Sequence, residues 1–224
     1  MTFDTYWPWI ALFALGAYHG INPGMGWLFA VALGLQERNS RAVLRALPPI
    51  ALGHLISIGL VVAVVQAAQG KLPGSSLRYT TALVLCGFGL FKLFRSRHPH
   101  WARWSGMCVG FHDLTLWSFL MASAHGAGLM LVPIILALPA NAHSHHTHDM
   151  ASHMASLQAL TLSGSSSWWM PVGIHTLGYL SLTGLVALTV YWKLGLTILR
   201  QAWFNLDFVW ALALVGTGIL TLLF

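Results

Sequence analysis

Charged side chains are scarce in this sequence. They make up 7% of the 224 residues, and only five residues are acidic, whereas a soluble domain carries about 25% charged residues. Hydrophobic residues account for 57% of the chain. So few charges cannot cover a globular surface with polar groups. The composition therefore excludes a soluble globular domain and predicts that lipid is the main solvent.

Cysteine is scarce as well. The two cysteines, Cys86 and Cys108, exclude a disulfide framework and a multi-thiolate metal site, and we interpret them as small packing residues. The formal net charge is +6, but the basic residues form short runs between apolar segments, which argues against a nucleic-acid partner. No cleavable signal is expected, because the N-terminus lacks Lys and Arg and the first apolar stretch is too long.

Long apolar runs are what the sequence does contain. A membrane-spanning helix needs about 20 apolar residues, and six segments qualify, at 6–35, 47–68, 77–94, 107–140, 168–191 and 204–224. The first and fourth segments are longer than a span needs, so we expect them to be tilted, broken or partly re-entrant. In the first, Pro23 lies among three glycines between residues 20 and 26, which predicts a break in the helix. A discontinuous helix is a pointer to the binding site of a transporter.

The basic residues predict how the chain crosses the membrane. Positive loops face the cytoplasm, and nine of the eleven basic residues lie in the loops after the first, third and fifth segments: Arg38, Arg41, Arg45, Lys92, Arg95, Arg97, Arg103, Lys193 and Arg200. The other two, Lys71 and Arg78, follow the second segment. This pattern predicts a multi-pass protein of a bacterial-type inner (plasma) membrane, with both termini outside.

The two halves of the chain resemble each other. The stretch 77–94, LRYTTALVLCGFGLFKLF, aligns without a gap with 206–223, LDFVWALALVGTGILTLL. The order of features also repeats, with Tyr-His-Gly in the first segment and Ala-His-Gly in the fourth. Three spans in each half make the second half insert upside down. We therefore predict an all-α membrane protein of six transmembrane helices, built as two inverted three-helix repeats over residues 1–98 and 99–224.

Four histidines fall inside predicted spans: His19, His54, His125 and His175. Intramembrane polar residues usually face the bundle interior, and imidazole is the commonest ligand for transition metals. Asn22 lies one helical turn from His19, so both can face one point. We predict a metal site from these five residues. His19 and His125 are favoured as central ligands, while an interhelical hydrogen bond explains His54 and His175 equally well.

Two further groups of polar residues are candidates for contact with ions. Asp113 is a candidate for an ion path or proton relay, with an interfacial charge as the alternative, and the same alternative is favoured for Asp207. The tract 141–154 is rich in histidine, which is a compositional signal for metal binding. Its members predict weak metal capture in an outer loop, with an ordinary solvated loop as the alternative: His143, His145, His146, His148, Asp149 and His153.

The motifs GAYHGINPGMGW (16–27) and GHLISIG (53–59), with the histidine-rich loop, resemble the nickel/cobalt efflux (NicO-like) family. That family belongs to the lysine-exporter superfamily of three-plus-three inverted-repeat transporters. The resemblance is sharpest over residues 11–95. His19, Pro23 and Gly24 match a family element, His-x-x-x-Pro-Gly-His, and Met25 stands where its second histidine would be. In the family the histidine-rich segment usually follows the third span, and here it follows the fourth.

These observations predict a transporter of a divalent transition-metal ion, with nickel or cobalt favoured, and not an enzyme. The metal ion and the lipid bilayer are the expected partners, and no permanently bound cofactor is expected. No ATPase motif is present, so transport would be secondary or driven by a partner. The main alternative is an exporter of a small organic solute, such as an amino acid. An intramembrane metal hydrolase and a haem protein rank lower.

Overall fold

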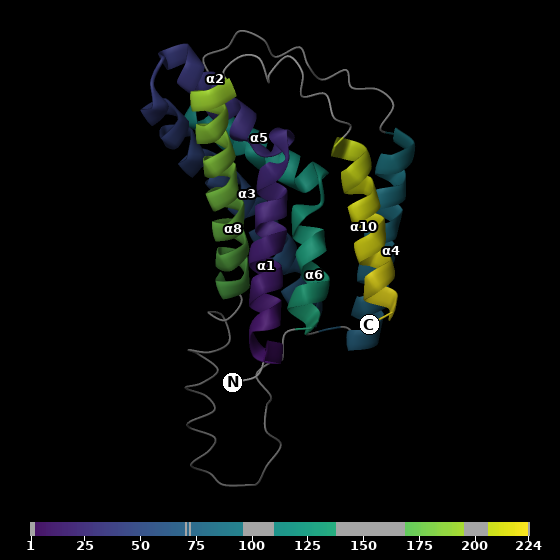
Figure 1. The fold of residues 1–224 in the computed structure, drawn as a ribbon. Coiled ribbons are helices and arrows are strands. Elements are labelled where there is room, and N and C mark those ends of the chain that lie inside the picture. Colours follow the sequence, from purple (N-terminus) through teal and green to yellow (C-terminus); the bar gives the residue numbers. More distant parts are fainter. Residues whose placement is uncertain are drawn as a thin grey trace, which may run out of the picture.

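The computed structural model describes residues 3–69, 71, 73–95, 110–137, 169–194 and 206–223. Every secondary-structure element among these residues is helical (Figure 1), which confirms the all-α prediction. The helices are α1 (Phe3–Ile21), η1 (Pro23–Met25), α2 (Trp27–Glu37), α3 (Ser40–Gln69), α4 (Gly74–Arg95), α5 (Phe111–Ala124), α6 (Ala127–Ala137), α8 (Trp169–Thr189), η2 (Val190–Leu194) and α10 (Leu206–Leu223). The short η1 is a 3-10 helix, and η2 is a π-helical turn.

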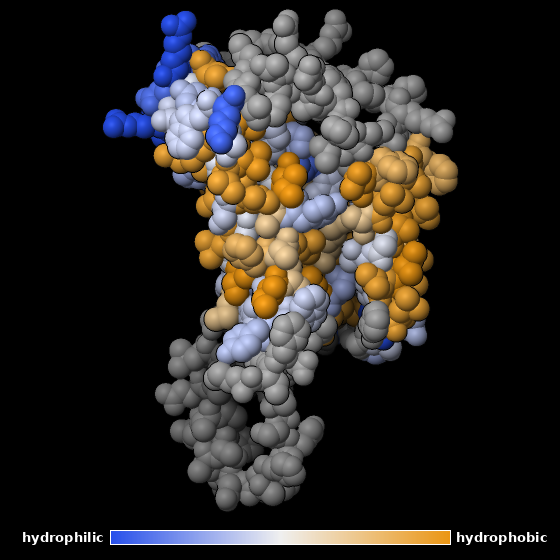
Figure 2. All heavy atoms as spheres, viewed as in Figure 1, coloured by the Kyte–Doolittle hydropathy of each residue, from blue (hydrophilic) through white to orange (hydrophobic). Residues whose placement is uncertain are grey.

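Several helices are long and apolar enough to cross a membrane. Among the described residues there are three such helices, Ser40–Ala68, Ser75–Phe94 and Trp169–Lys193, or four if the bent pair α5–α6 forms one span. Large apolar side chains lie exposed on their outer faces, as Leu83 (75%) and Val64 (63%) illustrate. Figure 2 shows such apolar surface over much of the visible face of the bundle. Exposed apolar surface on this scale is typical of a membrane protein.

The first apolar segment is broken where proline and glycine predict it. α1 ends at Ile21, and the chain makes one 3-10 turn before α2 begins at Trp27. The Asn22 side-chain oxygen accepts a hydrogen bond from Gly24 N at 2.9 Å, and Trp27 Nε1 donates one to Ile21 O at 2.8 Å. Gly26 has φ +130°, a conformation that favours glycine. These contacts satisfy backbone groups that the break leaves without helical partners.

The fourth apolar segment is broken too. α5 and α6 meet at an angle of 59° across a break of His125 and Gly126. Gly126 has φ +68°, in the left-handed region. The predicted break in the first segment is confirmed, and of the three forms expected for the fourth segment (tilted, broken or partly re-entrant) the structure shows a bend between two helices.

Three helix pairs make the most extensive contacts: α1 with α8, α3 with α5, and α4 with α10. The α1–α8 pair is so close that a Cβ on Gly16 would lie 2.0 Å from His175 O, and a Cβ on Gly178 would lie 2.2 Å from Phe13 O. Small residues let membrane helices approach to backbone contact. In Figure 1, α4 and α10 lie side by side at one flank of the bundle. The buried core includes Trp27, Tyr179 and Trp210.

Candidate functional site

Three of the predicted histidines meet in the interior of the bundle. His19 lies near the end of α1, His54 on α3 and His175 on α8, and each is 0% exposed. Their ring centroids are 5.0 Å apart for His19 and His175, 5.6 Å for His54 and His175, and 5.9 Å for His19 and His54. We call these three residues the histidine cluster. The close approach of α1 and α8 at Gly16 places His19 near His175.

The cluster contains ring nitrogens without partners. His19 Nδ1 lies 2.7 Å from Leu15 O, and since a carbonyl only accepts, this nitrogen carries the proton. His19 Nε2 therefore keeps its lone pair, and it is buried with no hydrogen-bond partner among the described residues, as is the Nδ1 atom of His54, whereas the ring of His175 interacts with the backbone of Leu12. His54 Nε2 and His175 Nε2 face each other at 3.5 Å. Buried polar atoms normally have partners, so the unpartnered nitrogens of His19 and His54 are the atoms of the cluster with spare capacity for a ligand.

The three imidazole rings of the histidine cluster are not arranged around a common point. Within the part of the chain that the structure describes, no group of three or more His, Cys, Asp or Glu side chains is arranged to hold a metal ion. His54 and His175 are stacked with an interplanar angle of 7°, and His19 meets them at 66° and 74°. Because ligand lone pairs lie in the ring plane, an ion could bind only after at least one ring turns.

His125 lies outside the cluster. It is 4% exposed, and its Nδ1 donates to Met121 O at 2.8 Å. Its ring centroid is 5.9 Å from that of Trp210, which in turn lies 4.6 Å from His19. Trp210 thus contacts both histidines. The sequence pairs His19 with His125, whereas the structure groups His19 with the two histidines for which hydrogen bonding was an equal alternative.

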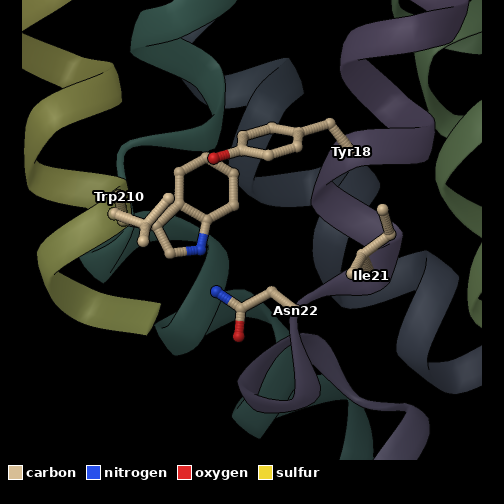
Figure 3. Close-up of a pocket in the computed structure, with 5 residues that line it drawn as sticks. Tyr18, Ile21, Asn22 and Trp210 are labelled. Carbon is tan, nitrogen blue, oxygen red and sulfur yellow. The ribbon is translucent and has the colours of Figure 1, made fainter. Parts of the chain in front are cut away.

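Asn22 lies beside a small pocket rather than in the cluster. Tyr18, Ile21, Asn22, Val209 and Trp210 line this pocket, which has a volume of about 40 Å³ (Figure 3). Asn22 is 4% exposed, and its Nδ2 has no hydrogen-bond partner among the described residues. Such a pocket has room for a few atoms.

The remaining predicted residues divide into those seen and those outside the described part. Asp113 is exposed in the first turn of α5, where its Oδ2 accepts a hydrogen bond from Gly110 N at 2.9 Å. An acidic side chain in the first turn stabilises a helix N-terminus. The position of Asp113 therefore fits the alternative that it is an interfacial charge. The side chain of Asp207, Cys108 and the whole tract 141–154 lie outside the described residues.

Two aromatic residues at the site were missed by the sequence argument. The Tyr179 ring stacks on His54 with centroids 3.8 Å apart, and its hydroxyl donates to Met25 O. Tyr179 follows His175 by four residues, so helical spacing was an available signal. Trp210 gave no such signal, because its place depends on how α10 packs against α1.

Comparison of the chain with protein-family models, with curated proteins and with solved structures gives no significant match. The candidate function therefore rests on the geometry of the described residues.

Proposed function

We propose that this chain is a membrane transporter of a divalent transition-metal ion, with nickel or cobalt as the favoured cargo. The histidine cluster would hold the ion within the bilayer. The observation that carries this proposal is the meeting of three buried imidazoles from three helices, with unpartnered nitrogens on His19 and His54. Imidazole suits nickel, copper and zinc, and an apolar shell around such ligands is typical of metal sites.

The need for ring rotation suits a carrier better than a permanent metal site. A transported ion must bind and leave, so its ligands should have a resting arrangement without the metal. His19 lies next to the break between α1 and α2, where a change in the backbone can turn its ring. Discontinuous helices supply the binding sites of many secondary transporters.

The inverted repeat is also part of the proposal, and the packing of α4 against α10 supports it. A Cβ on Gly89 would lie 3.1 Å from Ala211 O, and a Cβ on Gly218 would lie 3.2 Å from Ala82 O. In the gap-free alignment, Gly89 matches Gly218 and Ala82 matches Ala211. Exchanging the two aligned helices therefore turns each of these contacts into the other, as a two-fold axis between the helices requires.

Exchange of the halves also accounts for the other two helix pairs. The exchange maps the broken span α1–α2 onto α5–α6, with α1 on α5, and it maps α3 onto α8. The α1–α8 pair therefore corresponds to the α3–α5 pair, and both pairs make extensive contacts. We propose six spans, formed by α1–α2, α3, α4, α5–α6, α8 and α10. In the proposed orientation both termini face out of a bacterial-type inner membrane.

Transport by reconstituted protein tests the proposed function. Proteoliposomes that contain a metal-sensitive dye report entry of nickel or cobalt, and a parallel assay follows exchange of labelled amino acids. We expect metal entry by the parent, strong loss in His54→Ala, and no loss in His112→Ala, whose exposed ring lies in the first turn of α5. Amino-acid exchange without metal entry would favour the organic-solute exporter instead. Metal entry that is unchanged in His54→Ala would contradict the assignment of the cluster.

A further inference from the structure

Two side-chain hydrogen-bond donors border the otherwise apolar pocket beside the histidine cluster. The orientation of Asn22 is set by its neighbour: Gly24 N–H donates to the side-chain oxygen at 2.9 Å, so the amide nitrogen must point the other way. Figure 3 shows this nitrogen directed into the pocket, toward the ring nitrogen of Trp210. The Nδ2 atom is buried without a partner among the described residues.

Trp210 supplies the second donor. An indole N–H only donates, and no hydrogen bond of the described residues engages it. Trp210 is 2% exposed, so its N–H has little access to water except through the pocket. The buried Nδ2 of Asn22 needs an acceptor, because an unpaired buried donor carries a desolvation penalty of about 1–3 kcal/mol, and an acceptor between the two N–H groups would serve both. The same two donors present positive charge to the pocket and so disfavour a bare cation there.

A divalent cation in the neighbouring histidine cluster would favour an acceptor that carries negative charge. His19, His54 and His175 are neutral ligands once they bind a metal, and no acidic side chain of the described residues contacts them. A divalent cation in this buried place would lack a counter-charge, which is expensive in an apolar interior. Trp210, which lines the pocket, connects it to the cluster, because the ring centroids of Trp210 and His19 lie 4.6 Å apart.

We propose that the pocket between Asn22 and Trp210 is a subsite for a small carboxylate that accompanies the metal ion. The inference rests on the proposed function and names its substrate class: the cargo is a metal ion with an anionic oxygen ligand rather than a bare cation. The volume of about 40 Å³ has room for a single carboxylate group.

Titration of the purified full-length protein with nickel tests the subsite, with formate as the probe. Nickel affinity is measured by calorimetry in a non-coordinating buffer, with sodium formate or with sodium chloride at equal concentration. We expect formate to raise the nickel affinity of the parent by about 5- to 150-fold, the usual range for coupled sites. Trp210→Phe keeps an aromatic ring and removes the donor, so the effect of formate should disappear.

Two more variants sharpen the test. Asn22→Asp keeps the acceptor for Gly24 N–H and places a carboxylate in the pocket itself, so it should bind nickel more tightly without formate and no longer respond to it. Trp117→Phe is the matched control: its indole N–H is also buried without a partner, but it lies on α5 away from the pocket, and it should keep the formate effect.

The outcomes separate the two proposals. Nickel binding by the parent that ignores formate overturns the subsite and leaves the cluster in place. An equal formate effect in the parent, Trp210→Phe and Asn22→Asp overturns it too. Absence of nickel binding in both salts overturns the proposed function and the co-ligand with it.

Discussion

The two helix breaks are built alike and surrounded differently. His19 stands near the end of α1 and His125 directly after α5. In both, Nδ1 donates to the carbonyl four residues earlier, at 2.7 Å to Leu15 O and at 2.8 Å to Met121 O. A glycine follows each histidine. The shared local design supports the idea that the two segments are copies of one unit.

The surroundings separate the two histidines. His19 faces two further imidazoles, and the chain after it makes a 3-10 turn that buries Asn22. His125 is followed by a single glycine with positive φ, and its ring lies against Trp210. Trp210 aligns with Thr81 in the first half, so this large aromatic has no counterpart there. Local sequence therefore determines where a helix breaks, whereas contacts with distant helices determine what can bind at the break.

The largest expected effect separates the two histidines directly. His19→Ala removes a cluster imidazole, whereas His125→Ala removes a ring that is not a member of the cluster and lies against Trp210. We expect His125→Ala to weaken nickel binding within the roughly 10–100-fold range of residues that support ligands, and His19→Ala to weaken it more. Calorimetric titration of both purified variants measures the difference. Equal losses would mean that the two breaks contribute to one site in the same way.

The next effect concerns the seam that carries His19 to its partners. Gly16→Ala places a Cβ 2.0 Å from His175 O, so α1 and α8 must separate. Overpacking of this kind destabilises by about 1–3 kcal/mol, and the separation should also weaken nickel binding. Gly173→Ala, on α8, is the control because no atom lies within 4 Å of its Cβ. Thermal unfolding in detergent, with a parallel nickel titration, reads both consequences. A Gly16→Ala protein as stable as Gly173→Ala would contradict the close approach.

A smaller effect is expected at the hydrogen bond that spans the first break. Trp27→Phe removes the donor to Ile21 O and leaves that carbonyl without its side-chain partner. The expected destabilisation is about 0.5–1.5 kcal/mol, measured by unfolding in mixed detergent micelles. Trp117→Phe, which loses an N–H that has no partner, should not be destabilised. If both variants lose the same stability, ring packing rather than the hydrogen bond is responsible.

The smallest effect is at the contact between α3 and α5. Ser57 Oγ and Ser123 Oγ lie 2.9 Å apart, and interhelical hydrogen bonds in membranes contribute about 0.6 kcal/mol on average. Ser57→Ala and Ser123→Ala should each lose about this much, and the double variant should lose no more than either. Additive losses in the double-mutant cycle would show that the two hydroxyls do not act as a pair. With His125 placed over His19 and His54 over His175, the corresponding positions are Ala17 and Gly178, so the α1–α8 pair has no counterpart of this polar contact.

Sequence reasoning reached the features that depend on nearby residues. The break at Pro23 and Gly26 was predictable because proline and glycine act on their own backbone. The grouping of His19 with His54 and His175 was not, because it depends on how three helices rotate about their axes as they pack. Trp210 illustrates the same limit, since nothing near it in the chain shows that it lies against His19. Tyr179 was within reach, one turn after His175.

The ligand environment of bound nickel shows directly whether the histidine cluster holds the metal. X-ray absorption spectroscopy on the purified protein, loaded with one equivalent of nickel, reports imidazole ligands through scattering from the atoms of the ring. We predict scattering from two or three imidazoles in the parent, and clear loss of it in the His54→Ala/His175→Ala double variant. A spectrum without imidazole scattering, or one that is unchanged in the double variant, would contradict metal binding by the histidine cluster.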